Sequence, residues 1–251
     1  WNFLGFPLVV AVAAAVLAPW GGLGFGAGFA FLAVLPTTIS SAVGMTAAAR
    51  GDVAAAVFST VLSNLAGVVL VPTLALLWFS GQGTPLDPGQ MLGKLALVVV
   101  LPLTAGQILR CIRRLGTFVS ARAGSLRLLS SGLITLIVLA SFQRGFGSDA
   151  WSGLAVAEVL AAAAVVVAVL LVVMLGTHWT ARGVGLTGPL RPSAFYCATQ
   201  KTLAIGVPLA HSLHLASPTA VPEPSLLLVP LMLYHPLQLF VGSALSRHLS
   251  P

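Results

Sequence analysis

Two stretches of this sequence of 251 residues combine hydroxyl side chains with proline and glycine inside apolar runs. The first, LPTTISSAVGMT, covers residues 35–46, and the second, YCATQKTLAIGVP, covers residues 196–208. Within a membrane helix, proline and glycine free backbone groups that neighbours, water or a ligand must satisfy. Broken helices at matching positions in the two halves of a chain point to the binding site of a membrane transporter. The two stretches therefore predict a binding site for a solute or an ion.

Lys201, near the centre of the second stretch, carries the strongest chemical signal in the sequence. A charged side chain in the middle of a bilayer costs about 3 kcal/mol on one scale and more than about 10 kcal/mol on another. No acid stands at a similar depth, because Asp52 and Glu158 each lie near the start of an apolar run. We expect the ammonium to face a cavity or a partner group, and a structural ion pair remains the alternative.

The apolar run that follows each stretch has polar groups in its middle. Thr60 and Asn64 are four residues apart, as are Tyr234 and Gln238, so that each pair shares one face of a helix. Any single hydroxyl here could instead bond the preceding turn or join two helices, and the ring of His235 could simply be packed. The candidates for substrate or ion binding are Thr38, Ser40, Ser41, Thr60, Asn64, Thr199, Gln200, Lys201, Thr202, His235 and Gln238.

The composition places these candidates in a membrane protein. Hydrophobic residues make up 58% of the chain and charged residues 7%, with a mean hydropathy of +1.03, whereas a soluble domain has about 25% charged residues. The 12 basic residues are too few and too scattered for a nucleic-acid-binding face. The two cysteines form no CxxC motif, and there is no GxSxG, no HExxH and no pair of deep aspartates. These observations exclude a soluble globule, a disordered chain and a nucleic-acid binder, and they favour neither an enzyme nor a zinc site.

Eight apolar runs are candidates for membrane crossings, since one crossing needs about 20 residues. We predict an all-α polytopic membrane protein with helices near residues 3–19, 24–49, 53–79, 91–109, 126–142, 154–176, 194–213 and 226–245. The two runs with polar breaks, each followed by a run with polar groups, have opposite sidedness in the membrane. This arrangement predicts an inverted repeat.

The basic residues are distributed unevenly over the connections between these runs. One side carries Arg144, with Lys94 just inside a helix. Because cytoplasmic loops are enriched in Lys and Arg, we place the other side, and with it both ends of this sequence, in the cytoplasm of a multi-pass protein of the cell (inner) membrane. The nine basic residues of that side are Arg50, Arg110, Arg113, Arg114, Arg122, Arg127, Arg182, Arg191 and Arg247.

Four motifs connect the polar stretches with a known family. They are SSAV at residues 40–43, continued by GD at 51–52 and AAAVF at 54–58; QKTLAIGVP at 200–208; LVP at 228–230 with YHPLQ at 234–238 and GS at 242–243; and, more weakly, PL at 102–103 with GQILR at 106–110. In order and spacing they resemble the bile acid:sodium symporter superfamily, closest to its sodium/bile acid cotransporter 7 branch with the bacterial SBF-like proteins. The resemblance covers nearly the whole chain.

The resemblance implies ten helices in two inverted five-helix repeats, in which a core domain with two crossed, unwound helices moves against a panel domain. By position, the first run here is similar to the third helix of the family. We therefore expect a fragment that lacks the first two helices, which belong to the panel. We expect first-repeat core helices in residues 1–80, panel helices in residues 81–150 and second-repeat core helices in residues 151–251.

The resemblance also bears on sodium, which the sodium-coupled carriers bind with a carboxylate and a glutamine in the second crossing helix. Gln200 is similar in position to that glutamine, but the carboxylate position falls at about Tyr196, and Lys201 stands where those carriers have asparagine. The resemblance leaves Ser41, Thr60 and Gln200 as a reduced set of sodium ligands. An ammonium has three donors and suits the C-terminal end of a half-helix, so we infer that Lys201 replaces one bound sodium or carries the coupling proton.

Taken together, residues and resemblance predict a secondary-active transporter of a small organic anion that works by alternating access. Its partners would be the substrate anion and the lipid bilayer, with sodium or a proton as coupling ion and no other cofactor. A transporter-fold membrane protein that regulates ion or calcium homeostasis without transporting is the alternative.

Overall fold

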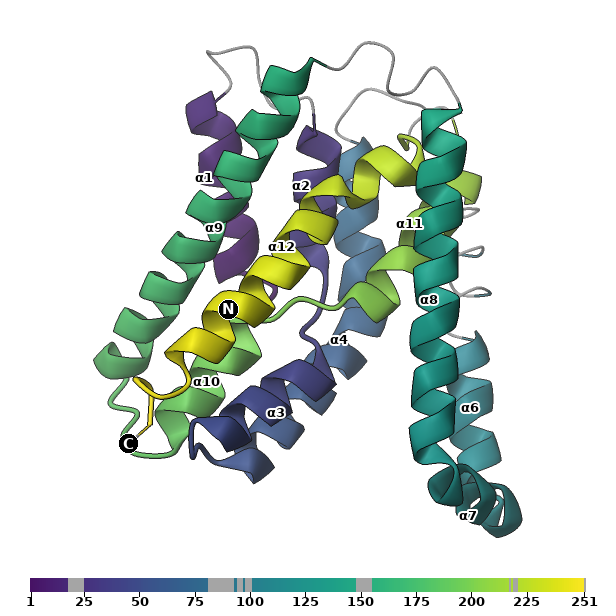
Figure 1. Cartoon of the computed structure of the whole chain (residues 1–251), viewed down its shortest axis with the longest axis vertical. Helices are drawn as coiled ribbons and strands as arrows, with labels where there is room; N and C mark the ends of the chain where they lie inside the picture. The colour runs from purple at the N-terminus through teal and green to yellow at the C-terminus, as the bar shows by residue number, and fades with distance from the viewer. Residues whose placement is uncertain are drawn as a thin grey trace.

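The computed structural model describes residues 1–17, 25–80, 93, 97, 101–147, 155–216, 218 and 221–250. All the regular secondary structure of these residues is helical (Figure 1). The all-α class predicted from the sequence is confirmed. The helices are α1 (Gly5–Leu17), α2 (Gly26–Val34), α3 (Ile39–Ala48), α4 (Val53–Ser80), α6 (Leu101–Cys111), α7 (Arg113–Ala121), α8 (Ala123–Phe146), α9 (Val156–Gly183), α10 (Leu190–Thr199), α11 (Leu203–Ala216) and α12 (Pro224–Leu245).

Three helices of the described residues, α8, α9 and α12, are long and apolar enough to cross a membrane. The pair α2 and α3 is bent by 66° at its break and adds a fourth crossing if it is counted as one span. The chain is therefore a polytopic membrane protein. Of the run predicted at residues 91–109, α6 covers the second half, whereas residues 91–100 lie outside the described residues except for 93 and 97.

The two acids considered as partners of Lys201 lie at helix starts, as the sequence indicated. Asp52 accepts a hydrogen bond from the backbone N–H of Ala55 through Oδ1 at 2.9 Å at the start of α4. Glu158 accepts one from the N–H of Ala155 through Oε2 at 3.2 Å at the start of α9. Side-chain oxygens at these positions satisfy the free N–H groups of a first helical turn, so both carboxylates have a local structural role.

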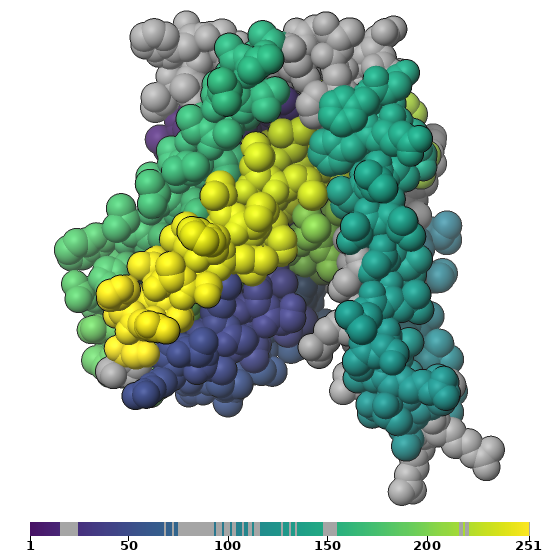
Figure 2. Space-filling view, viewed as in Figure 1, coloured from purple at the N-terminus to yellow at the C-terminus, as the bar shows by residue number. Residues whose placement is uncertain are grey.

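The helices form two groups (Figure 1). The first contains α1, α2, α3, α4, α9, α10, α11 and α12, and the second contains α6, α7 and α8. Helix α8 contacts the first group through α11 and α12, and Ser141 of α8 lies 2.9 Å from Nε2 of His211 in α11. Toward the end where α7 lies, the two groups separate (Figure 2).

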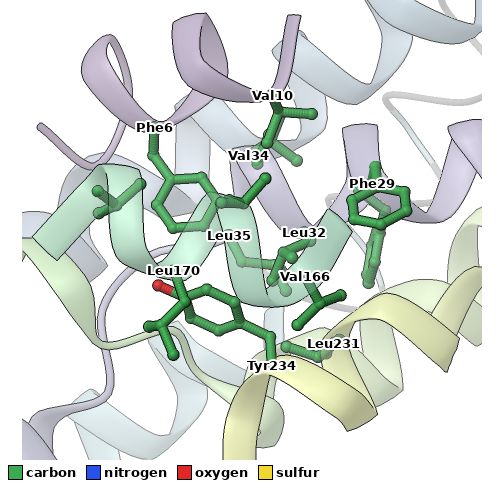
Figure 3. Packing of buried hydrophobic residues seen from close by; sticks show 14 of the residues in the cluster. Phe6, Val10, Phe29, Leu32, Val34, Leu35, Val166, Leu170, Leu231 and Tyr234 are labelled. Atoms are coloured by element: carbon green, nitrogen blue, oxygen red, sulfur yellow. The ribbon is translucent and has the colours of Figure 1, made fainter. Parts of the chain in front are cut away.

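Aromatic and aliphatic side chains from α1, α2, α9 and α12 form the core of the first group (Figure 3). The rings of Phe6 and Tyr234 meet edge to face with centroids 5.4 Å apart. Gly28 of α2 allows close approach of α12, since a Cβ placed on it would lie 2.8 Å from Cδ of Pro230. This packing holds α2 and α12 rigidly beside the break between α2 and α3.

The sequence did not predict α7, which occupies part of the expected connection between residues 109 and 126. With nine residues it is too short to span a bilayer. Phe118 and Val119 are about half exposed, and the Arg122 guanidinium lies 4.7 Å from the centroid of the Phe118 ring. Figure 1 places α7 at the lower end of the molecule, where the α3–α4 turn, the α9–α10 connection and the C-terminus also lie.

Candidate functional site at the two broken helices

Both polar stretches are interrupted helices, as the sequence predicted. Residues 35–38 separate α2 from α3, and residues 200–202 separate α10 from α11. Proline disfavours helical geometry in the residue before it, and Leu35, which precedes Pro36, has extended backbone angles (φ −66°, ψ 144°). Gln200 at the end of α10 is also extended (φ −86°, ψ 130°).

The two unwound segments contact each other directly. The N–H of Thr202 donates to the carbonyl oxygen of Pro36 at 3.2 Å, and the hydroxyl of Thr38 donates to the carbonyl oxygen of Lys201 at 2.6 Å. Thr38 is the N-cap residue of α3, yet its side chain does not cap that helix. Backbone groups that each break frees are therefore satisfied by the other break.

The Lys201 ammonium lies at the C-terminal end of α2. Its Nζ donates to the carbonyl oxygens of Leu35 at 2.7 Å and Ala33 at 3.2 Å, and to that of Asn2 at 3.3 Å. The side chain is completely buried, and Nζ lies 4.1 Å from the centroid of the Phe6 ring. The last carbonyls of a helix lack partners within it and carry partial negative charge. All three donors are used, and no carboxylate pairs with Lys201 in the part of the chain that the structure describes.

Gln238 of α12 clamps the backbone of the same lysine. Its Oε1 accepts from the Lys201 N–H at 2.6 Å, and its Nε2 donates to the Lys201 carbonyl oxygen at 2.9 Å. The amide also lies 2.8 Å from Nδ1 of His235. Nδ1 also lies 3.2 Å from the carbonyl oxygen of Lys201, so the imidazole contacts both the Gln238 amide and the backbone that this amide holds. The predicted pair of His235 and Gln238 therefore supports the break from behind.

Helix α4 supports the first break in a similar way. Asn64 donates through Nδ2 to the carbonyl oxygens of Thr37 at 3.0 Å and Thr60 at 2.7 Å. Ser63 accepts through Oγ from the N–H of Thr37 at 3.4 Å and from Nδ2 of Asn2 at 3.2 Å. Ser63 was not among the predicted site residues, although its position beside Asn64, three residues after Thr60, places it on the same helical face.

An open cavity of about 620 Å³ lies in front of the crossing, next to the first turns of α3 and α11. Four predicted site residues, Thr38, Ser40, Asn64 and Thr202, line it together with Ile39, Val43, Gly44, Val57, Ala204 and Ile205. Thr60, Thr199, Gln200, Lys201 and Gln238 are buried and, like His235, are not among the residues that line it. The first N–H groups of a helix and its positive dipole end favour an anion, so the cavity suits a negatively charged group.

The three residues considered for sodium differ in their surroundings. Oγ of Ser41 and Oε1 of Gln200 are buried oxygens without a hydrogen-bond partner among the described residues. The hydroxyl of Thr60 donates to the carbonyl oxygen of Val57 at 3.0 Å, which is the ordinary bond to the preceding turn. Tyr196, at the position of the family's carboxylate, donates its hydroxyl to the carbonyl oxygen of Gly242 at 2.9 Å. Two of these oxygens are therefore buried without a partner, whereas the hydroxyls of Thr60 and Tyr196 are each bonded to a backbone carbonyl.

Comparison with known proteins identifies the family of this chain. The model of the SBF-like CPA transporter family matches residues 1–251. The chain belongs to this family. The prediction of a transporter and not an enzyme is thereby confirmed at the level of the family.

Individual relatives also support the family assignment. This chain is 33% identical over 249 residues to protein PA2026 of Pseudomonas aeruginosa, with 98% of this chain and 72% of the relative covered. It is 30% identical over 213 residues to sodium/bile acid cotransporter 7 of Mus musculus, with 84% of this chain and 60% of the relative covered. The chain thus spans about three fifths of the length of the mouse relative.

Proposed function

We propose that this protein is a secondary-active transporter that moves a small organic anion by alternating access around the crossing of its two broken helices. The observation that carries the proposal is the open cavity beside the first turns of α3 and α11. Two half-helix N-termini at one cavity are an arrangement that transporters use to hold anionic groups. At about 620 Å³ the cavity is also within the range of roughly 300–1,000 Å³ that is typical of small-molecule sites.

The proposed architecture is an inverted repeat in which α2–α4 corresponds to α10–α12 with opposite sidedness. The end of the molecule that carries the arginine-rich connections faces the cytoplasm, because of the bias of Lys and Arg toward cytoplasmic loops. Helices α6 and α8 belong to the panel, against which the other group moves.

For coupling, the Lys201 ammonium is the covalently attached equivalent of one bound cation. Its bonds to the carbonyl oxygens of Ala33 and Leu35 support this role, since a free cation at the end of α2 would meet the same oxygens. A second cation, sodium, would be held by the free oxygens of Ser41 and Gln200. Loss of a proton from Lys201 during the cycle is the alternative form of coupling.

The test uses the full-length protein. A thermal-shift screen of organic anions, with and without sodium and across pH, identifies a substrate, since a ligand stabilises by RT ln(1 + [L]/Kd). Uptake of that anion into proteoliposomes is then measured for the wild type and for Lys201→Ala. We expect the wild type to take up the anion. We expect Lys201→Ala either to lose this uptake or to change its dependence on sodium and pH. Binding without uptake would instead identify a non-transporting regulator, and unchanged uptake with unchanged ion dependence in Lys201→Ala would remove both coupling roles of the lysine.

A further inference from the structure

A second pocket lies at the arginine-rich end of the molecule, away from the crossing of the broken helices. Its volume is about 150 Å³, and three segments line it: the end of α9, the start of α10 and the residues after α12. Its polar lining consists of His178 and Arg182 from α9, Arg191 from α10, and His248 and Ser250. The volume is below the roughly 300 Å³ of sites for drug-sized ligands, so the pocket suits a small group.

The charge of this lining has one sign. Two arginines and two histidines face the pocket, and none of the described residues that line it carries a carboxylate. Within the described ranges, neither arginine forms an ion pair, and Asp52, which adjoins the start of α10, directs Oδ1 to the N–H of Ala55. Uncompensated cations around a concave surface favour an anion.

One arginine of the lining is oriented by a hydrogen bond to the connection between α9 and α10. Nε of Arg191 donates to the carbonyl oxygen of Leu186 at 2.6 Å, which orients the guanidinium and leaves its four terminal N–H groups for a ligand. His178 and Arg182 are four residues apart in α9 and therefore share one face. A planar guanidinium suits the oxygens of phosphate, to which it can donate two parallel hydrogen bonds.

The position of the pocket points to the membrane surface as the source of this phosphate. Trp179, next to His178 in α9, is 64% exposed, and the Arg182 guanidinium lies 5.9 Å from its ring centroid. Exposed tryptophans with neighbouring cations are typical of the headgroup layer, and basic pockets between helices on the cytoplasmic side bind anionic headgroups. Resting on the proposed orientation, in which this end of the molecule faces the cytoplasm, we propose that the pocket between α9, α10 and the C-terminal segment binds the phosphate group of an anionic phospholipid of the cytoplasmic leaflet.

Purified full-length protein, titrated with phosphatidylglycerol, phosphatidylcholine or inorganic phosphate, tests the proposal. The readouts are the shift in the midpoint of thermal unfolding, relative to each variant without additive, and the number of bound lipids by native mass spectrometry. We expect phosphatidylglycerol to bind and stabilise the wild type more than phosphatidylcholine does. Arg182→Gln should weaken this binding about tenfold, which corresponds to about 1.4 kcal/mol, because it removes a charge-assisted hydrogen bond to the phosphate.

Arg122→Gln is the matched control, since Arg122 is an exposed arginine at the same end of the molecule but outside the pocket. This variant should bind phosphatidylglycerol like the wild type. Equal weakening by Arg122→Gln, or equal binding of the two lipids, would overturn the proposal. A third outcome is that inorganic phosphate stabilises the protein through Arg182 while the two lipids bind equally. The ligand would then be a soluble phosphate, and the proposal that it is a membrane lipid would be wrong.

Discussion

The side-chain nitrogen of Lys201 lies 2.7 Å from the carbonyl oxygen of Leu35, to which it donates a hydrogen bond. The break in the second half of the chain thus supplies the cation that neutralises the helix end at the break in the first half. In the opposite direction, the hydroxyl of Thr38 in the first break donates to the carbonyl oxygen of Lys201 in the second. Each break needs the other to supply hydrogen-bond partners for its backbone groups. We therefore expect the two breaks to form together and to be disrupted together.

Replacement of Lys201 by alanine should make the protein depend on sodium for stability. The variant leaves the carbonyl oxygens of Ala33 and Leu35 without the ammonium, and each unsatisfied buried group costs about 1–3 kcal/mol. We expect a lower midpoint of thermal unfolding in choline buffer and a partial recovery in sodium buffer, because sodium can enter the vacated space. The wild type should respond less to the same exchange.

Arg247→Ala is the control for this experiment, since Arg247 is an exposed cation after α12. It should unfold at the wild-type temperature in both buffers. If sodium stabilises the wild type and Lys201→Ala equally, the ammonium does not stand in for a cation.

Gln238→Leu should destabilise the protein through the backbone of Lys201. The substitution keeps an apolar side chain of similar size but removes both the acceptor for the Lys201 N–H and one donor to its carbonyl oxygen. We expect a loss of about 2–4 kcal/mol in the free energy of unfolding, measured by denaturant titration in detergent.

The control for the glutamine is Gln143→Leu in α8, where the side chain is exposed. Surface substitutions usually change stability by less than about 0.5 kcal/mol. A loss of the same size at both positions would show that the clamp on Lys201 contributes nothing specific.

The sequence predicted the broken helices and singled out Lys201, because residue types alone carry both signals. Pro36 inside an apolar run and an ammonium without a nearby acid are both visible in residue types. The partners of the ammonium are not, because they are backbone carbonyls of Ala33 and Leu35, and every residue has a carbonyl. Asp52 and Glu158, which the sequence placed at the starts of apolar runs, accept hydrogen bonds from the first turns of their helices.

The sequence also left open which polar residues would face the cavity. In an unwound segment neither the helical period nor the strand period tells which way a side chain points. Thr202 lines the cavity, whereas its neighbours Gln200 and Lys201 are buried and are not among the residues that line it. The short helix α7 was missed because its nine residues, rich in arginine, match no membrane-spanning pattern.

Gly28→Ala should loosen the contact between α2 and α12. The added methyl group would lie 2.8 Å from Cδ and 2.9 Å from Cγ of Pro230, and 3.0 Å from the carbonyl oxygen of Leu227. A proline ring and a backbone oxygen cannot move aside easily, and overpacking of this kind costs about 1–3 kcal/mol. A fall in the thermal midpoint measures it, with Gly132→Ala in α8 as the control. No other group lies within 4 Å of a Cβ built on Gly132, so that variant should be neutral or slightly more stable. Equal midpoints for the two variants would contradict the close contact.

Ser40→Phe should block transport without unfolding the protein. Ser40 is exposed in the first turn of α3 and lines the cavity of about 620 Å³, so a phenyl ring there takes space that a solute would occupy. Steric exclusion worth about 1–3 kcal/mol corresponds to a loss of uptake of roughly fivefold to 150-fold. Ala48→Phe, at the far end of the same helix and also exposed, adds the same ring outside the cavity and should transport normally. Proteoliposome uptake and the thermal midpoint are measured for both variants. Full uptake by a folded Ser40→Phe protein would mean that the solute does not pass through this cavity.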